Sequence, residues 1–429
     1  MSKTKQLPAG DPRELGFDPA RLNRIGRTMD AAVDARNIPG TITLVARKGR
    51  VVHTHVTGKL DIERPAPLAI DSLFRMYSQT KPVTAAVLLT LCEEGLFMLD
   101  EPVSKWIPEF KNPNVIAYPS ARDRVRGTPS VSFTSTVKAR REITIFDLLT
   151  MTSGIAAMSR TPAAYWPTYA PVLEGTGFAP GDTRINDPRG SYEDLVLAVA
   201  SNPLHSQPGD TWQYGQDFDV LSLFLTRVSG MSLDRLFKTK MFEPLGMHES
   251  AFYCSEGDLG RLVTDHQWDP NKGLVVRDRP EQTEKAGRSP RKLMSGNGLF
   301  GGIVSTPWDY ARFAQMLLNG GELDGVRVLG RKTVELMTRN HIGERCIDLG
   351  TGPNYGFGLG VCVRKTNEGT PTPGSPGTFG WGGAAGTWFF VDPREELFGL
   401  FFTHLFGYQL LPIGDLFERF EKMTYEALV

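Results

Sequence analysis

The spacing of apolar residues changes twice within the first hundred positions. Residues 19–36 carry apolar side chains three and four positions apart, which predicts an amphipathic helix. Residues 41–46 and 51–56 alternate and are rich in β-branched side chains, with a glycine-containing turn between them, so they predict a hairpin. Good helix formers then run over 78–94, and Gly95 stands where a helix would end.

The middle of the chain has a mostly helical pattern broken by proline-rich and polar segments. Helices are expected over 143–154, 192–200, 218–228, 233–241 and 308–319. Residues 111–141 and 269–292 are polar without a period, and we expect exposed loops there. The loop over 155–190 carries Tyr165, Trp166 and Tyr169. Its pattern leaves open whether these rings pack as satellite core or form a lid over a pocket.

The last part of the chain returns to strands. They are expected over 356–363, 379–381, 387–391 and 397–404, before a closing helix over 413–426. Strands near both ends with helices between them predict an α+β fold of two domains. Residues 1–98 and 295–429 would form one α/β domain with a central antiparallel sheet, and residues 99–294 a mostly helical domain inserted in it. A cleft between the two is a usual place for a ligand.

Composition removes several classes of partner. The 429 residues include 48 basic and 48 acidic side chains, so no net charge favours nucleic acid or an anionic membrane. The start of the chain lacks the apolar core of a signal peptide, and four cysteines without C-x-x-C spacing are typical of reduced thiols. We therefore expect a cytoplasmic protein. The seven histidines form no metal-binding motif, so neither a metal nor a cofactor is expected, and the oligomeric state is open.

Candidate chemistry begins where the 78–94 helix begins. Ser78 and Lys81 are three positions apart, so on a helix their side chains share one face. A serine hydroxyl becomes a good nucleophile when a neighbouring base takes its proton, and a lysine can serve if burial or nearby cations lower its pKa. The backbone N–H groups at a helix start favour a developing oxyanion. By itself the pair is more often an ordinary solvated helix turn.

Two further stretches supply the rest of a site. Tyr214 follows a Pro-Gly turn and precedes a helix, where it could share the proton of Ser78 with Lys81. Gly382 and Gly383 interrupt a predicted strand, which suggests that something approaches the backbone closely. The N–H of Ala384 would then complete an oxyanion hole with that of Ser78. The residues 298–310 read as a structural turn and helix start without chemistry.

Taken in order, these stretches resemble the serine β-lactamase and penicillin-binding-protein superfamily. Ser78-Gln79-Thr80-Lys81 matches its S-x-x-K, Tyr214-Gly215-Gln216 falls at its Y-x-N, and Trp381-Gly382-Gly383 falls at its K-T-G. The likeness extends over residues 20–425. It implies the β-lactamase-like fold, a catalytic trio of Ser78, Lys81 and Tyr214, and an oxyanion hole at Ser78 and Ala384. The candidate substrate-binding residues are Tyr77, Gln216, Trp381, Gly382, Gly383 and Trp166.

Two departures narrow the expected activity. Trp381 stands where β-lactamases carry the lysine that holds the carboxylate of the antibiotic, and Gln216 stands in place of an asparagine. Trp-Gly-Gly together with Tyr214 and Asp219 looks like the family VIII carboxylesterases. The resemblance thus implies cleavage of short neutral esters through an acyl-serine, with a small-molecule ester as partner. Acyltransferase, amidase, D-aminopeptidase and β-lactamase activities stay open. So does a non-enzymatic binding module, although all three catalytic positions are filled.

Overall fold

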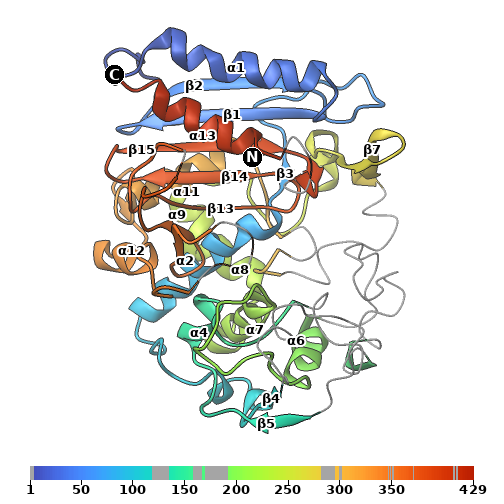
Figure 1. Ribbon diagram of the computed structural model, residues 1–429, viewed down its shortest axis with the longest axis vertical. Coiled ribbons are helices and arrows are strands. Elements are labelled where there is room, and N and C mark those ends of the chain that lie inside the picture. The colour runs from blue at the N-terminus through green and yellow to red at the C-terminus, as the bar shows by residue number, and fades with distance from the viewer. Residues whose placement is uncertain are drawn as a thin grey trace.

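A seven-stranded antiparallel sheet joins the two ends of the chain (Figure 1). The computed structural model describes residues 4–117, 135–157, 167–169, 192–281, 295–298, 302–345, 347, 349, 352–370, 372–408, 411 and 414–429. The strands, in spatial order, are β11 (Tyr355–Phe357), β12 (Cys362–Arg364), β13 (Phe379–Gly382), β14 (Trp388–Asp392), β15 (Leu397–Thr403), β1 (Gly40–Arg47) and β2 (Arg50–Gly58). Thr41 lies opposite Thr403, so the N-terminal hairpin is paired directly to the C-terminal strands.

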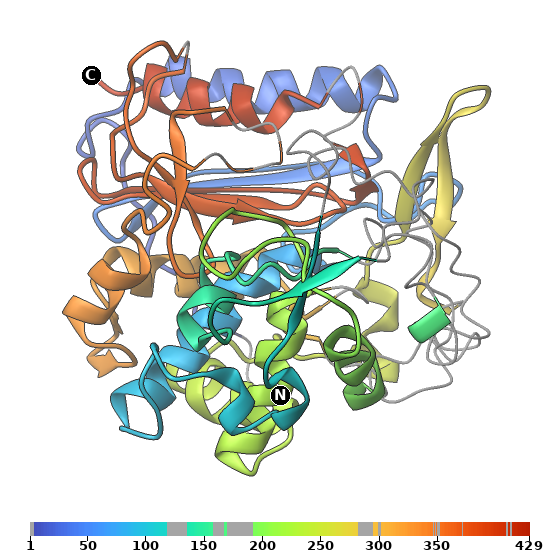
Figure 2. The same ribbon diagram turned by 60° about the horizontal axis from the view of Figure 1, so that its bottom comes forward.

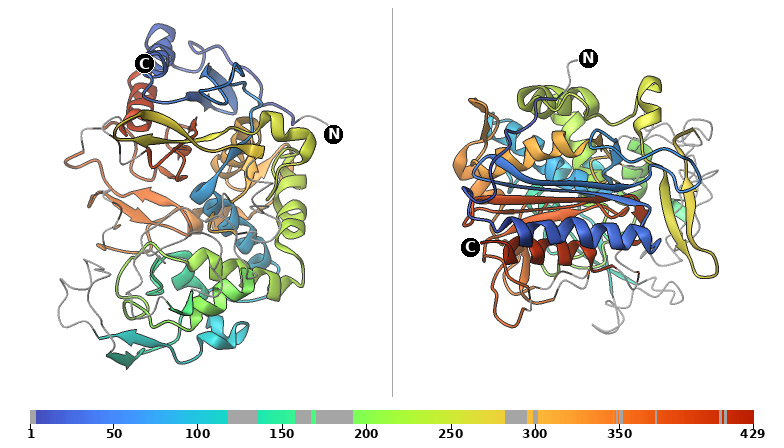
Figure 3. Two further views of the ribbon diagram at one scale, coloured as in Figure 1. Left: turned by 90° about the vertical axis from the view of Figure 1, so that its right-hand side faces the viewer. Right: turned by 90° about the horizontal axis from the view of Figure 1, so that it is seen from above.

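Helices cover both faces of this sheet. Helices α1 (Pro19–Asp34) and α13 (Leu416–Glu426) lie side by side on one face, and α11 (Pro307–Leu318) and α2 (Thr80–Glu93) lie on the other (Figure 3). Successive side chains along a strand point to opposite faces of the sheet. Phe401 belongs to the apolar cluster beneath α13, and Phe402 belongs to the larger core that includes α2. Both sheet faces are therefore apolar, and β15 is buried along its whole length.

Helix α2 lies at the centre of the molecule. Every residue from Thr80 to Leu91 is buried. The helix lies between the sheet and the helices α7 (Asp217–Ser229) and α8 (Leu233–Phe237). Helices α4 (Ile145–Leu149) and α6 (Tyr192–Ala200) pack beyond α7 (Figures 1 and 2). A helix apolar on all sides is typical of such a position. The division into domains at residues 98 and 295 stays a prediction.

Most predicted elements are present, but three interpretations were wrong. Within the exposed loop expected over 111–141, β4 (Asn114–Ile116) pairs with β5 (Thr136–Lys138), and Val115 and Ile116 are buried. The single strand expected over 356–363 is the hairpin of β11 and β12, because the chain reverses at Gly358–Gly360, where Gly360 has φ +79°. Part of the expected exposed loop over 269–292 is strand: β6 (Asp265–Asp269) pairs with β7 (Gly273–Asp278), and β16 (Leu405–Phe406) pairs with β6. The residues 282–292 of that loop lie outside the described residues.

The remaining elements are short. They are β3 (Phe74–Arg75) paired with β8 (Val304–Ser305), β4 (Asn114–Ile116) with β5 (Thr136–Lys138), β9 (Glu322–Leu323) with β10 (Val326–Arg327), α9 (Glu243–Leu245), α12 (Arg331–Met337), a π turn over Lys238–Phe242, and 3-10 turns over Tyr77–Gln79, Val103–Lys105, Pro108–Phe110 and Glu256–Arg261. Within the part of the chain that the structure describes, no helix combines the length and apolar character needed to cross a bilayer.

Candidate active site

Ser78 lies in the 3-10 turn that leads into α2, and its side chain is half-buried. Its Oγ is 2.5 Å from the phenolic oxygen of Tyr214, which comes from a segment more than a hundred residues away. Ser78 N–H belongs to the first turn of this helical stretch, where amides lack an acceptor within the helix. The structure therefore brings the predicted nucleophile and the predicted tyrosine into direct contact.

Lys81 is buried completely, and its ammonium group binds two oxygens. Nζ donates to Tyr214 Oη over 2.7 Å and to the carbonyl of Asn297 over 2.6 Å. It also lies 4.7 Å from the centroid of the Tyr214 ring. Among the described residues no hydrogen bond joins Nζ directly to Ser78 Oγ. Tyr214 thus stands between the two residues of the S-x-x-K pair, and the hydrogen-bonded path is serine, tyrosine, lysine.

Tyr214 is held by the segment that follows α4. Gln213 N–H donates to the Met151 carbonyl over 2.9 Å, and Ala157 N–H donates to the Tyr214 carbonyl over 3.2 Å. A side chain at Gly215 would overlap the carbonyl of Ile155, so only glycine fits there. Main-chain bonds on both sides of Tyr214 therefore set the place of its ring, independently of what the phenol contacts.

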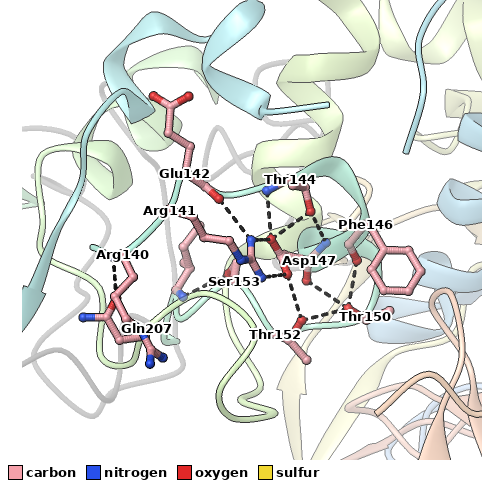
Figure 4. A network of polar contacts seen from close by, with 12 residues as sticks. Arg140, Arg141, Glu142, Thr144, Phe146, Asp147, Thr150, Thr152, Ser153 and Gln207 are labelled. Carbon is pink, nitrogen blue, oxygen red and sulfur yellow. Dashed lines mark hydrogen bonds and ion pairs between the residues drawn. The ribbon is translucent and has the colours of Figure 1, made fainter. Parts of the chain in front are cut away.

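That supporting segment is anchored by Asp147 (Figure 4). The carboxylate of Asp147 accepts from both terminal nitrogens of Arg141 and from the N–H and hydroxyl of Thr144, which caps α4. Thr152 donates to the same carboxylate over 3.4 Å. Next along the chain, Ser153 donates to Asp217 over 2.5 Å. The network of Figure 4 is in this way connected, through one short segment, to the residues beside Tyr214.

Two buried acids near the start of α7 have different surroundings. Asp219 accepts from Ser295 (2.6 Å), Tyr192 (2.9 Å), Asn297 (2.6 Å) and Gln216 (2.8 Å). Asp217 accepts from Ser153, while its second oxygen has no partner among the described residues. Burial raises the pKa of both carboxyl groups. Asp219 holds the side chain of Asn297, whose carbonyl accepts from Lys81, and so it fixes one of the two partners of that ammonium group.

The backbone on the other side of Ser78 is packed against glycines. Tyr77 has φ +45°, a left-handed conformation that non-glycine residues rarely adopt. A side chain at Gly298 would overlap the carbonyl of Tyr77, and one at Gly383 would overlap the carbonyl of Met76. The described residues supply no acceptor for Ala384 N–H, which follows Gly383 directly. The glycines therefore let two chain segments lie directly against the turn that carries Ser78. This is the side of Ser78 on which the oxyanion hole is expected.

The predicted substrate-binding residues differ in what they contact. Tyr77 and Gln216 are buried, with Tyr77 bonded to Asp265 and Gln216 to Asp219. Gly382 approaches the ring of Trp388. Trp381 is 5% exposed and stacks on Tyr214, with ring centroids 6.3 Å apart and planes 23° apart. Trp166 lies outside the described residues. Trp381 is therefore the candidate whose aromatic ring stacks on a member of the catalytic trio.

Sequence reasoning missed Asn297 and the role of the glycines that follow it. The stretch from Gly298 was interpreted as lacking chemistry, yet Gly298 and Gly302 both lie against the Tyr77 carbonyl. Asn297 contributes a main-chain carbonyl, which no residue type signals. In the described part of the chain, no three histidine, cysteine or acidic side chains gather as a metal site would require.

The chain is similar to known proteins over nearly its whole length. Protein Rv1367c of Mycobacterium tuberculosis is 32% identical over 86% of each chain, and Esterase EstB of Burkholderia gladioli is 28% identical over 92% of this chain and 93% of its own. Two solved structures share the fold: EstCE1, titled a hydrolase with promiscuous acyltransferase activity (TM-score 0.72, 24% identity, 94% and 98% covered), and LovD of Aspergillus terreus (0.73, 22%, 94% and 98%).

The predicted family and fold are confirmed by these likenesses and by the family model. That model, described as Beta-lactamase, matches residues 25–416, which include the whole of the serine, lysine and tyrosine arrangement. The central antiparallel sheet with helices on both faces is the β-lactamase-like fold. The chain belongs to the Beta-lactamase family.

Proposed function

We propose that this protein is a carboxylesterase that cleaves short neutral esters through an acyl-serine intermediate. The observation that carries the proposal is the path from Ser78 Oγ to Tyr214 Oη (2.5 Å) and on to Lys81 Nζ (2.7 Å). It supplies a nucleophile with a proton acceptor already within hydrogen-bond distance. The relatives named Esterase EstB and Lovastatin esterase support the same reaction class.

In the acylation step, Ser78 Oγ attacks the ester carbonyl. As the C–O bond forms, the hydroxyl proton of Ser78 passes to Tyr214 and Lys81, which act together as the base. The carbonyl oxygen becomes an oxyanion, which the N–H groups of Ser78 and Ala384 bind. When the tetrahedral intermediate collapses, the relay gives its proton to the leaving alcohol. The products of this half-reaction are a free alcohol and an ester of Ser78.

Deacylation uses the same groups in reverse. Water attacks the acyl-serine and passes a proton to the relay of Tyr214 and Lys81, which then returns it to Ser78 Oγ. The carbonyl of Asn297 holds the Lys81 ammonium throughout, because it comes from main chain that the Asp219 carboxylate anchors. The acid leaves, and the site regains its starting protonation.

The aromatic rings beside Tyr214 favour uncharged substrates. Trp381 stacks on Tyr214, and Phe357 lies edge-on to Trp381 with centroids 5.3 Å apart. An indole offers no cation for the carboxylate of a β-lactam, whereas apolar groups gain roughly 25 cal/mol for each Å² that they bury. We therefore expect k_cat/K_M for p-nitrophenyl butyrate to exceed that for benzylpenicillin and nitrocefin.

Acyl transfer to an alcohol is a second candidate. It is supported by the likeness to EstCE1, whose title records promiscuous acyltransferase activity, and it needs the same acyl-serine. The discriminating observation is the fate of the acyl group when a simple alcohol competes with water. A product mixture dominated by the new ester at millimolar alcohol would favour the transferase, and a product that stays almost wholly acid would favour the esterase.

The direct test is a panel of p-nitrophenyl esters of rising acyl length, followed by mass spectrometry of the quenched enzyme. We expect fastest turnover of short acyl groups, and an added acyl mass on the peptide that contains Ser78. An adduct on another residue, or equal turnover of benzylpenicillin and the butyrate ester, would contradict the proposal. The cytoplasmic location and the absence of macromolecular partners stay predictions.

A further inference from the structure

A buried tyrosine–carboxylate pair lies directly behind the nucleophile. Tyr77, the residue before Ser78, is 8% exposed, and its hydroxyl donates a hydrogen bond to Asp265. Asp265 is fully buried at the start of β6, nearly two hundred residues further along the chain. The pair takes no part in the proton path through Tyr214, so its place beside the nucleophile requires another explanation.

The backbone of Tyr77 is the reason that this pair matters. Its φ of +45° is left-handed, and a bulky residue in that region is strained unless surrounding contacts hold it there. The same peptide unit carries Ser78 N–H, the expected oxyanion donor, and sets the direction of Ser78 Oγ. If Tyr77 relaxed to an ordinary negative φ, Ser78 N–H and Ser78 Oγ would point away from the site.

Contacts hold Tyr77 on two sides. Gly298 (φ +82°) and Gly302 (φ +66°) lie against its carbonyl, at positions where any side chain would collide. On the other side, the ring lies edge-on to Phe406 at 5.6 Å, and the hydroxyl is bonded to Asp265. Phe406 belongs to β16, which pairs with β6, so one small sheet supplies both contacts to the side chain.

The charges around Asp265 favour its role as a fixed acceptor. Arg75 Nη1 lies 3.5 Å from one carboxylate oxygen, and Arg277 Nη1 lies 3.9 Å from the other. The Arg277 guanidinium also covers the Phe406 ring at 3.9 Å. Burial, with the nearby Asp265 charge, raises the pKa of the Tyr77 phenol, so it remains a proton donor to the carboxylate at any working pH. The hairpin of β6 and β7, which carries Asp265 and Arg277, projects at one end of the central sheet (Figure 2).

We propose that Asp265 is a positioning residue for the acyl-transfer step, which acts through the Tyr77 hydroxyl to hold the left-handed turn that aims the N–H and Oγ of Ser78. This inference rests on the proposed function. It adds no chemical step and explains how Ser78 is oriented toward the ester. The Tyr77 hydroxyl and the Asp265 carboxylate bond to each other and to no side chain of the serine, tyrosine and lysine relay. Their loss should therefore lower k_cat and leave K_M nearly unchanged.

A double-mutant cycle tests the assignment. Tyr77→Phe and Asp265→Asn should each lower k_cat about 10- to 100-fold, the range expected when a reacting group is misplaced by about 1 Å. The double variant should be no slower than the slower single one, because both changes break the same contact. Asp269→Asn is the matched control and should keep the wild-type rate, because Asp269 is a half-buried acid at the far end of β6 whose carboxylate accepts from the turn amides of Asn271 and Lys272.

The labelling rate of Ser78 by a fluorophosphonate gives an independent readout, because it requires an aimed nucleophile but no particular ester. Labelling should slow in parallel with k_cat in both variants, with circular dichroism confirming that they are folded. If one variant fails to fold, the other carries the test, since Phe fills the space of Tyr77. Wild-type labelling rates in both variants, or multiplying losses in the double variant, would overturn the inference. An unlabelled wild type would instead overturn the proposed function.

Discussion

The two sides of Ser78 are held in place by different kinds of contact. On the relay side, Lys81, Tyr214 and Asn297 are joined by hydrogen bonds of 2.6–2.7 Å. On the backbone side, the Met76–Ser78 turn and the Gly383–Ala384 segment are held close by the absence of side chains at glycines. Groups that move protons are fixed by hydrogen bonds to one another, whereas the turn that carries the N–H donors is fixed by close packing at glycines together with the bond from Tyr77 to Asp265. Substitutions on the two sides should therefore fail in different ways.

The largest effect should come from the residue that both sides share. Ser78→Ala should lower k_cat by at least about 10⁴-fold, as for nucleophiles of other serine hydrolases, because neither side can act without Oγ. The melting temperature should change little, since one hydrogen bond contributes only about 1 kcal/mol. Ser201→Ala, an exposed serine at the end of α6, is the control and should keep full activity. Residual turnover of several per cent would identify a different nucleophile.

On the relay side, losses should be large but should not multiply. Lys81→Met and Tyr214→Phe should each lower k_cat about 10³-fold or more, and the double variant should be little worse than the slower single one, because one proton path is interrupted in both. Lys332→Met, at a side chain that is 78% exposed, controls for the loss of a cation. Independent, multiplying losses in steady-state kinetics would show that the two residues do not act in one proton path.

On the backbone side, a single methyl group should be enough to impair catalysis. Gly383→Ala would push the segment away from the Met76 carbonyl, and we expect about a 10²-fold loss of k_cat through the displaced oxyanion donor. The pH profile should keep its shape, because the relay is intact. Gly260→Ala, where an added methyl meets nothing within 4 Å, is the matched control. A shifted pH profile would show that the two sides are not separable.

The smallest effect on activity should come from the far face of the sheet. Burial raises the pKa of Glu421 from 4.5 to about 7. The folded state therefore binds an extra proton between these values, and this contribution to the free energy of unfolding is present at pH 4.5 and lost as pH rises through 7. Glu421→Gln should flatten that decline, by up to about 3 kcal/mol, with k_cat unchanged. The measurement is the free energy of unfolding by urea at pH 5 and pH 8. An equal change between the two pH values in wild type and variant would contradict the prediction.

Elements with a clear pattern of apolar residues could be predicted from the sequence. Helix α1 keeps a clear apolar period because it packs one face on the sheet, and the hairpin of β1 and β2 is recognisable from its β-branched residues and its turn. The hairpin of β6 and β7 was missed because it lies at the margin of the molecule, where Asp269 and Arg277 obscure the alternation. The break between β11 and β12 depends on Gly358 and Gly360, and glycines alone do not distinguish a bulge from a reversal.

The same distinction holds within the site. Ser78, Lys81 and Tyr214 were predicted because their side chains carry the chemistry, and residue type reveals it. Asn297 contributes a main-chain carbonyl, and Tyr77 contributes a left-handed backbone conformation, so neither is recognisable from residue type. Gly383 was correctly expected to permit a close approach, but the approaching group is the Met76 carbonyl. Residues that act through their backbone become visible only when the partner segment is in place.

The pairing of β1 with β15 also constrains how the protein can be made. About 350 residues separate Arg47 from its partner Leu397, so β1 leaves the ribosome long before the strand that completes it. At the usual 5–20 residues per second, that delay is about 20–70 s. Throughout it, one edge of an apolar strand has no native neighbour and is open to other nascent chains. The long separation between the two strands therefore lengthens the time in which the first hairpin is open to wrong pairing.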